Sequence, residues 1–270
     1  MFFKKRKILT IDELNAYRIA YGNPIERKEL FVALGVPFLI GSFYVFILFF
    51  NWWLAILGGI ALMAYTYIVV IPQEEKRIYE SNAFTEKNNF VNNMTQILSN
   101  NERTVLQALK IVTERSNGEF KSDLQKLQAK IINGGREEVQ EAFQSLSDKY
   151  KDDVMFSLYI EQLTTIVIEG RNSIETLKDI KTYHNGVKKR LNRFMEAKKK
   201  KKRDFKFMCK VGLCLIGAIV MSLGFEKYIN VYTSNIIGWI SSGIYIGVLF
   251  KFYHEFRKLM GDDSITEVKI

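Results

Sequence analysis

The chain has 270 residues with 39 Lys and Arg against 29 Asp and Glu, and its net charge of +10 comes from one segment. Residues 181–210 carry 13 basic and 2 acidic side chains, so the other 240 residues carry 26 and 27 and are close to neutral. Basic residues confined to one segment do not form the broad basic surface of a nucleic-acid-binding domain. The composition, with 20 Phe, 13 Tyr and only 3 Pro, favours long helices over sheets and linkers.

The first predicted element is a short amphipathic helix over residues 10–21. Thr10 and Glu13 have the spacing of a capping box, and Gly22 followed by Pro24 ends the helix. The basic residues before it are followed by polar side chains, unlike the apolar stretch of a signal peptide. We therefore expect residues 1–29 to form a cytoplasmic N-terminal segment.

Residues 30–73 form the first predicted transmembrane hairpin. This stretch holds no charged residue, and as a single helix it would reach about 66 Å, roughly twice a hydrocarbon core of ~30 Å. The chain must therefore fold back, and the predicted turn is the sequence Asn-Trp-Trp at 51–53, with its tryptophans at the lipid–water boundary. The two spans are expected near 31–50 and 53–71.

Residues 206–250 form the second predicted hairpin, with spans near 206–225 and 232–250. Only Glu226 and Lys227 interrupt the apolar sequence between them. Gly243 and Gly247 in the last span have the small-xxx-small spacing that lets another helix approach closely.

Basic residues stand on one side of all four predicted spans, and the loops on the other side hold only Lys227. The positive-inside rule therefore predicts a multi-pass protein of the inner (cytoplasmic) cell membrane with both termini, including the tail 251–270, in the cytoplasm. The run before the third span is a membrane-edge basic belt, which attracts anionic lipids by about 1 kcal/mol per residue near the surface. The belt consists of Lys198, Lys199, Lys200, Lys201, Lys202 and Arg203.

Residues 78–203 form a polar insert without Pro, and its apolar residues recur at helical spacing. The pattern predicts a cytoplasmic helical-bundle domain, whose last helix runs on into the third span. Glycine turns separate its helices: Gly134 and Gly135 form a left-handed C-cap, and Gly170 ends a later helix. The six helices are expected near 84–99, 102–115, 120–131, 139–146, 154–166 and 174–200.

The fold class is therefore an all-α integral membrane protein, with four transmembrane helices in two hairpins that flank the helical bundle.

No catalytic residue, metal ligand or cofactor site is predicted, because the chain has no P-loop, GxSxG or HExxH motif. His184 is interpreted as a partly exposed surface residue. Glu137-Glu138 and Asp152-Asp153 follow turns and are interpreted as charges that cap helix N-termini. Cys209 and Cys214 are five residues apart on the reducing side of the membrane, so we expect small apolar fillers and neither a zinc site nor a disulfide.

Three stretches of the insert resemble the type II secretion system F domain family, the inner-membrane platform proteins of secretion systems and type IV pili, and among them the shorter Tad-type branch. The stretches are TVLQALKIV (Thr104–Val112), GGREEVQEAFQSL (Gly134–Leu146) and EGRNSIETLKDIKTYHNGVKKRLNRF (Glu169–Phe194). The resemblance covers residues 90–200. The chain departs from the family at Asn100-Asn101, where a glycine turn is usual, and at 171–173, where a second glycine often stands.

The resemblance implies a non-enzymatic platform that couples a cytoplasmic hexameric ATPase to the assembly of pilin or pseudopilin subunits. Because Tad-type systems usually pair two platform proteins, it also implies a homo-oligomer or a hetero-oligomer with a second platform protein. It does not indicate which machine or cargo is served.

Two other classes of function stay open. A membrane-tethered component of a DNA uptake or conjugation apparatus would contact nucleic acid through the basic belt, although no aromatic platform or groove-binding motif accompanies the belt. A solute transporter would need polar functional groups in the spans, and no ionisable residue lies deep within any of them.

Overall fold

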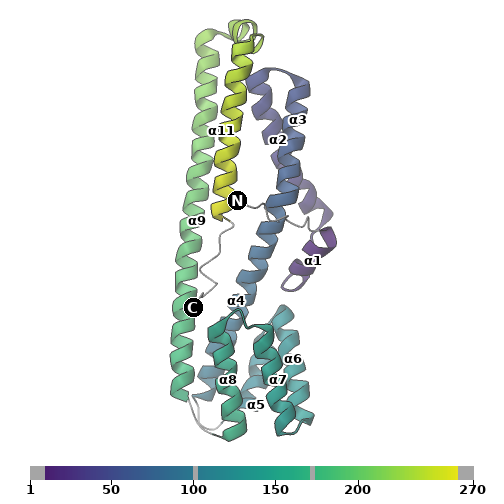
Figure 1. Cartoon of the computed structure of the whole chain (residues 1–270), viewed down its shortest axis with the longest axis vertical. Helices are drawn as coiled ribbons and strands as arrows, with labels where there is room; N and C mark the ends of the chain where they lie inside the picture. Colours follow the sequence, from purple (N-terminus) through teal and green to yellow (C-terminus); the bar gives the residue numbers. More distant parts are fainter. Residues whose placement is uncertain (1–9, 100–102, 171–173, 261–270) are drawn as a thin grey trace, which may run out of the picture. The chain divides into compact units, whose positions relative to one another are not determined.

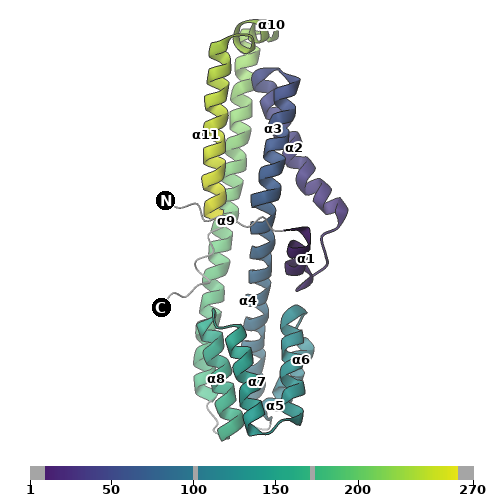
Figure 2. The same cartoon turned by 45° about the vertical axis from the view of Figure 1, so that its right-hand side comes forward.

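The computed structural model describes residues 10–99, 103–170 and 174–260 (Figures 1 and 2). Every regular element in these ranges is a helix, and none is a strand. The described residues form two compact units. Unit 1 contains 10–15, 24–76 and 196–260, and unit 2 contains 16–23, 77–99, 103–170 and 174–195.

The helices follow one another with short connections. In chain order they are α1 (Ile11–Ile19), α2 (Arg27–Phe49), α3 (Trp52–Tyr65), the π-helical turn η1 (Thr66–Val70), α4 (Ile71–Leu98), α5 (Val105–Arg115), α6 (Gly118–Asn133), α7 (Arg136–Lys149), α8 (Val154–Glu169), α9 (Ile174–Leu223), α10 (Phe225–Lys227), the π-helical turn η2 (Tyr228–Thr233) and α11 (Ile236–Met260).

Among the described residues, four helical stretches are long and apolar enough to cross a membrane: Arg27–Phe49, Trp52–Leu98, Ile174–Leu223 and Ile236–Met260. The prediction of an all-α chain with four such helices is confirmed, and it indicates a membrane protein. The side of the membrane on which unit 2 and the termini lie stays a prediction.

In unit 1 the break between α2 and α3 falls at the predicted Asn-Trp-Trp sequence. Phe50 adopts a left-handed conformation with φ of 49°, and the Asn51 side chain accepts hydrogen bonds from the amides of Trp53 (3.0 Å) and Leu54 (3.3 Å). Asn51 is therefore the N-cap of α3. Trp52 and Trp53 are largely exposed, as aromatic anchors at a membrane surface would be.

Helices α2 and α3 lie side by side (Figures 1 and 2). They pack closely because small residues face each other across the pair. A Cβ at Gly59 would lie 2.1 Å from Ser42 Oγ and 2.8 Å from Phe38 Cδ2. A Cβ at Gly41 would lie 3.1 Å from the Gly58 carbonyl oxygen. Only glycine permits this approach, which is the packing mode that small residues provide between helices in membranes.

Unit 2 has a large hydrophobic core to which α4 to α9 all contribute, and a smaller buried cluster of Phe84, Val187 and Leu191 between α4 and α9. Phe90, Phe120 and Phe156 lie at the centre of the large core and are fully buried. Their ring centroids are 5.5 to 6.0 Å apart with edge-to-face geometry, an arrangement that contributes about 0.5–1.5 kcal/mol per pair beyond burial. The amphipathic spacing of these helices accounts for the large core.

The glycine turns of unit 2 differ from one another. Gly170 has the expected left-handed conformation, with φ of 69°, at the end of α8. The left-handed C-cap predicted at Gly134 and Gly135 is wrong: Gly134 has φ of −99° and is extended. Glycine is needed there for space, because a Cβ would lie 2.6 Å from the Lys130 carbonyl oxygen. Gly135 is the N-cap of α7, and its amide donates to the Glu138 carboxylate at 2.9 Å.

Part of the N-terminal segment belongs to unit 2. The predicted Thr10–Glu13 capping box is present at the start of α1, and after α1 the Ala20 carbonyl accepts a 2.7 Å hydrogen bond from the Glu119 amide. Gly118 makes this contact possible: its φ is +61°, and a Cβ would lie 2.2 Å from the Ala20 oxygen. The segment is therefore held against the first turn of α6.

Candidate functional site

The most unusual feature of unit 2 is a set of polar side chains enclosed between α4, α9 and the start of α8. Lys87, Asn88 and His184 are 9%, 2% and 1% exposed. Buried polar groups are costly unless they find partners, so their hydrogen bonds define what the site can do. We call it the buried polar cluster. Its members are the buried Lys87, Asn88 and His184 and the half-buried Asn92, Asp153 and Asn185.

Asparagine amides connect α4 to α9 in the cluster. Asn88 Nδ2 donates to His184 Nδ1 (2.9 Å) and to Asn185 Oδ1 (3.0 Å). Asn92 and Asn185 exchange hydrogen bonds of 2.9 and 2.8 Å. Because Nδ1 of His184 accepts, its ring proton is placed on Nε2, 3.5 Å from Asp153 Oδ2. The amides and the imidazole ring thus form one connected network.

Asp153 joins this network to a buried ammonium group. Lys87 Nζ lies 2.6 Å from Asp153 Oδ2 and 5.6 to 6.0 Å from the ring centres of Phe84, Tyr150 and Phe156. Burial raises the pKa of Asp153, but the His184 ring and the Lys87 ammonium outweigh burial and lower the pKa to about 2. The carboxylate also accepts from the Phe156 amide (3.2 Å), which confirms the predicted capping role of Asp153 at α8.

A second polar group joins α4, α6 and α7 within unit 2. Lys149 Nζ lies 2.7 Å from Glu119 Oε1 and 2.5 Å from Asp123 Oδ2. Tyr79 and Tyr150 donate to the same two carboxylates, at 2.9 and 2.7 Å. Burial raises the pKa of Glu119, but the hydrogen bonds from Lys149 and Tyr79 outweigh burial, so that the pKa is lowered. One ammonium thus holds two carboxylates.

The predicted basic belt divides into two kinds of lysine. Lys199, Lys200, Lys201, Lys202 and Arg203 are exposed around α9. Lys198 is 5% exposed, and its Nζ donates a 2.9 Å hydrogen bond to the Met260 carbonyl at the end of α11. Stacking of Phe205 on Phe256, with centroids 4.6 Å apart, brings α9 and α11 together beside it. Lys198 is therefore a helix-capping residue.

The glycines that were predicted to pack between spans have open space around them. No atom among the described residues lies within 4 Å of a Cβ built at Gly243 or Gly247, so packing there stays a prediction. A different glycine, Gly212, lies at a close contact between α9 and α11. A Cβ at Gly212 in α9 would lie 2.9 Å from the Tyr245 hydroxyl of α11, and Tyr44 of α2 donates to the Cys209 carbonyl at 3.0 Å.

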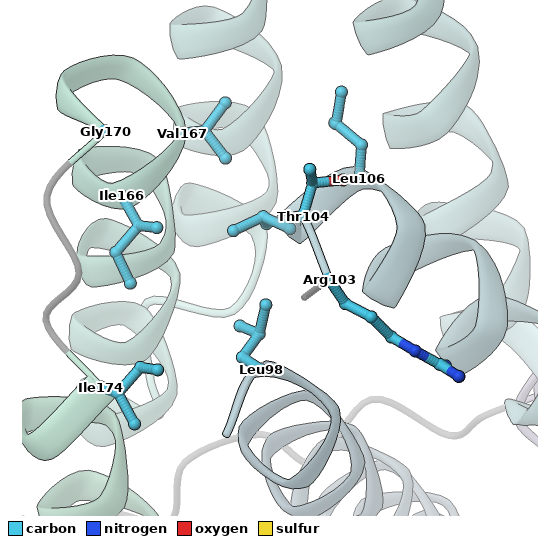
Figure 3. Close-up of a pocket in the computed structure, with 9 residues that line it drawn as sticks. Leu98, Arg103, Thr104, Leu106, Ile166, Val167, Gly170 and Ile174 are labelled. Carbon is cyan, nitrogen blue, oxygen red and sulfur yellow. The ribbon is translucent and has the colours of Figure 1, made fainter. Parts of the chain in front are cut away.

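A cavity of about 380 Å³ lies where α4 and α8 end and α5 and α9 begin (Figure 3). Leu98, Ile166 and Ile174 extend toward it, whereas the Arg103 guanidinium points away from these side chains. The predicted turn at Asn100-Asn101 and the residues at 171–173 lie outside the described residues.

The described residues contain no group of three or more His, Cys, Asp or Glu side chains placed to hold a metal ion. Sequence reasoning missed the buried polar cluster because His184 was interpreted as a surface residue, and that interpretation is wrong. A signal was present: His184 stands in the 3-4-3-4 spacing of Leu177, Ile180, Val187 and Leu191, all of which are buried.

The chain is similar in sequence to a bacterial protein. No protein-family profile and no solved structure matches the chain. An uncharacterized protein of Bacillus anthracis, pXO2-23, is 41% identical over 266 residues, which cover 98% of this chain and 96% of the relative. Similarity of this extent includes both units and all four candidate spans. The chain therefore belongs to the same protein family as this Bacillus anthracis protein.

Proposed function

We propose that the protein is a non-enzymatic membrane scaffold, the platform of a Tad-type pilus or type II secretion machine. In this role it couples a cytoplasmic hexameric ATPase to pilin or pseudopilin subunits in the membrane. The observation that carries the proposal is helix α9, which is unbroken over 50 residues from the core of unit 2 to the end of a candidate membrane span. The resemblance of residues 90–200 to the F domain family supports the same role.

Helix α9 has the features that a mechanical connection needs. Its first part is anchored in unit 2 by buried side chains such as Leu177 and Ile180, its middle carries the exposed residues 199–203, and its last part is apolar. A helix of this length reaches about 75 Å. It contains no proline, so no residue in it forces a kink.

The proposed orientation places unit 2 and both termini in the cytoplasm. All the large basic clusters lie on one side of the four candidate spans, which is the distribution that the positive-inside rule assigns to the cytoplasmic face. A cytoplasmic unit 2 could reach an ATPase, whereas the spans could reach membrane-embedded pilins.

Partner identification tests the proposal directly. The tagged protein would be cross-linked in its native cell, purified in mild detergent, and its partners identified by mass spectrometry. We expect a secretion ATPase, pilin-like subunits or a second four-span platform protein. Recovery of the protein without any of these would overturn the platform role and leave the fold unaffected.

Coupling through α9 has its own test. Insertion of two glycines between Phe194 and Lys202 should abolish pilus or secretion assembly while the protein stays inserted in the membrane, because glycine breaks helical stiffness. The matched control is the same insertion between Lys151 and Asp152, in the exposed turn between α7 and α8. Normal assembly with the α9 insertion would contradict mechanical coupling.

One observation favours a second candidate, a membrane-tethered component of a DNA uptake or conjugation apparatus. Five consecutive basic residues, 199–203, are exposed and available to phosphates. Replacing Lys199 to Lys202 by Gln, and leaving the capping residue Lys198 in place, separates the candidates. Loss of DNA binding with unchanged insertion would support the tether, whereas altered topology would support a role of the belt in membrane orientation.

A further inference from the structure

Within unit 2, α4 and α9 each carry a row of buried side chains with heptad spacing, and we call the two rows the seam. On α4 the seam residues are spaced by 4, 3, 4 and 3, and on α9 by 3, 4, 3 and 4. This spacing is that of coiled-coil helices. The seam consists of Phe84, Asn88, Val91, Thr95 and Leu98 on α4, and of Leu177, Ile180, His184, Val187 and Leu191 on α9. The two helices contact each other around Asn88 and His184, whereas Thr95 hydrogen-bonds with Tyr159 of α8.

The two helices run in opposite directions along this seam. Asn88 pairs with His184, while the earlier residue Phe84 lies in one buried cluster with the later residues Val187 and Leu191. Phe84 also stacks on the His184 ring, with centroids 4.9 Å apart and planes at 10°. Both contacts therefore belong to a single antiparallel register.

Apolar contacts alone would hold this register weakly. Leucine and valine gain burial from any apolar neighbour, since the hydrophobic effect has no direction. A slide of one turn in either direction would place Asn88 against Ile180 or Val187. The Asn88 amide and His184 Nδ1 would then be buried without partners, and such groups are costly in a protein interior. The polar residues thus penalise registers that the apolar residues would accept.

Two further contacts strengthen the same alignment. The reciprocal hydrogen bonds of Asn92 and Asn185 lie one turn along the seam and are satisfied in the same register. Lys87 and Asp153, 2.6 Å apart, connect α4 to the first turn of α8. The alignment is therefore fixed by directional contacts at two successive turns, with α8 as a third helix.

We propose that Asn88, Asn92, His184 and Asn185 are a register lock: they fix the axial alignment of α4 and α9 at a cost in stability. A buried polar pair in a coiled-coil seam has this role when it excludes other alignments. Helices α4 and α9 are also the two that continue from unit 2 into candidate spans. The lock would thus keep the two helices that leave unit 2 from sliding past each other.

A distance measurement between the two helices tests the lock in the full-length protein. Spin labels would be attached at exposed Asn82 on α4 and Asp179 on α9, after replacement of Cys209 and Cys214 by Ser. We expect one narrow distance distribution in the parent protein. In the lock-free variant, with all four lock residues replaced by Leu, we expect a second or broadened population displaced by about 5 Å, one helical turn.

Thermal melting separates the lock from ordinary packing. The lock-free variant should melt no lower than the parent, because a buried polar network can be replaced by apolar residues without loss of stability. The matched control Leu191→Ala removes apolar volume from the same seam. It should melt several degrees lower and keep the single distance.

A single unchanged distance in the lock-free variant would overturn the proposal, because the apolar seam would then define the register by itself. If that variant fails to fold, the double variant His184→Phe/Asn185→Leu provides the decision. It keeps an aromatic ring against Phe84 but removes both acceptors of the Asn88 amide and the partner of Asn92. A broadened distribution would support the lock, and an unchanged one would refute it. Neither outcome depends on the platform role, because pilus assembly is not measured.

Discussion

Lys198 Nζ donates a 2.9 Å hydrogen bond to the carbonyl oxygen of Met260, and this bond makes one member of a run of five lysines a buried cap. Its four successors are exposed on α9. A cation at a helix C-terminus satisfies carbonyls that have no partner within the helix and interacts favourably with the helix dipole.

Lys198→Met should therefore destabilise unit 1. The substitution retains most of the aliphatic side chain but removes the donor, so a loss of about 1–2 kcal/mol is expected from the missing charged hydrogen bond. Lys200→Met, at an exposed position, is the matched control and should change stability by less than about 0.5 kcal/mol. Thermal unfolding in detergent measures both, and equal effects would show that the Met260 contact is unimportant.

Gly118→Ala should release the segment 16–23 from unit 2. The new Cβ would have to occupy a left-handed conformation and lie 2.2 Å from the Ala20 oxygen, which costs about 1–3 kcal/mol. Hydrogen exchange should show faster exchange of the Glu119 amide, which donates to Ala20.

Gly186→Ala provides the comparison for this substitution. Gly186 lies within α9 with nothing within 4 Å of a Cβ, so alanine there should stabilise the helix by up to about 1 kcal/mol. Protection of the Glu119 amide that is the same in both variants would mean that Gly118 is not required for docking.

Acid should weaken unit 2 through Asp153. Its folded pKa, about 2, lies below the ordinary value of 3.8, so its contribution is complete above about pH 5 and is lost as the pH falls toward 2. The contribution is on the order of 2 kcal/mol. Asp153→Asn should be less stable at pH 7, because Lys87 loses its counter-charge. Its stability should also change less between pH 4 and 2, as chemical unfolding across this range would measure.

A steep acid dependence that persists in Asp153→Asn would assign the effect to other carboxylates, of which Glu119 is the first candidate because its pKa is also lowered.

Gly59→Ala should separate α2 from α3. The added methyl would lie 2.1 Å from Ser42 Oγ and 2.8 Å from Phe38 Cδ2, so the helices must move apart at a cost of about 1–3 kcal/mol. Gly35→Ala in α2 meets nothing within 4 Å and serves as the control. Thermal stability in detergent reports the difference, and tolerance of alanine at both positions would contradict close packing at Gly59.

Much of the architecture was predictable because apolar length and periodicity are properties of the sequence alone. Residues 30–73 must fold back, whatever their partners, and Asn51 is a residue type that caps helices. The 3-4-3-4 spacing through Leu177, Ile180, Val187 and Leu191 likewise indicated a buried stripe. The same spacing includes His184. Its burial could therefore have been predicted if the spacing had been given more weight than the usual exposure of polar residues.

Other features depend on contacts between distant parts of the chain and could not be predicted. Nothing in the run of lysines distinguishes Lys198 from Lys199, since the difference arises from the end of α11, 62 residues later. Gly134 resembles a left-handed cap in sequence, but the Glu138 carboxylate occupies the adjacent space and the backbone is extended. Gly212 is not part of a small-xxx-small pair. Its close contact with α11 depends on the position of the Tyr245 hydroxyl.

The π-helical turn η1, between α3 and α4, changes how the second candidate span must be interpreted. A π-turn accommodates an additional residue, and each residue corresponds to a rotation of about 100° around a helix of 3.6 residues per turn. Side chains after Val70 are therefore rotated, relative to those before Thr66, from the positions that a continuous α-helix would give them. A stripe traced along α3 cannot be extended into α4 by counting residues, and deletion of one residue between 66 and 70 would rotate one part of the span against the other.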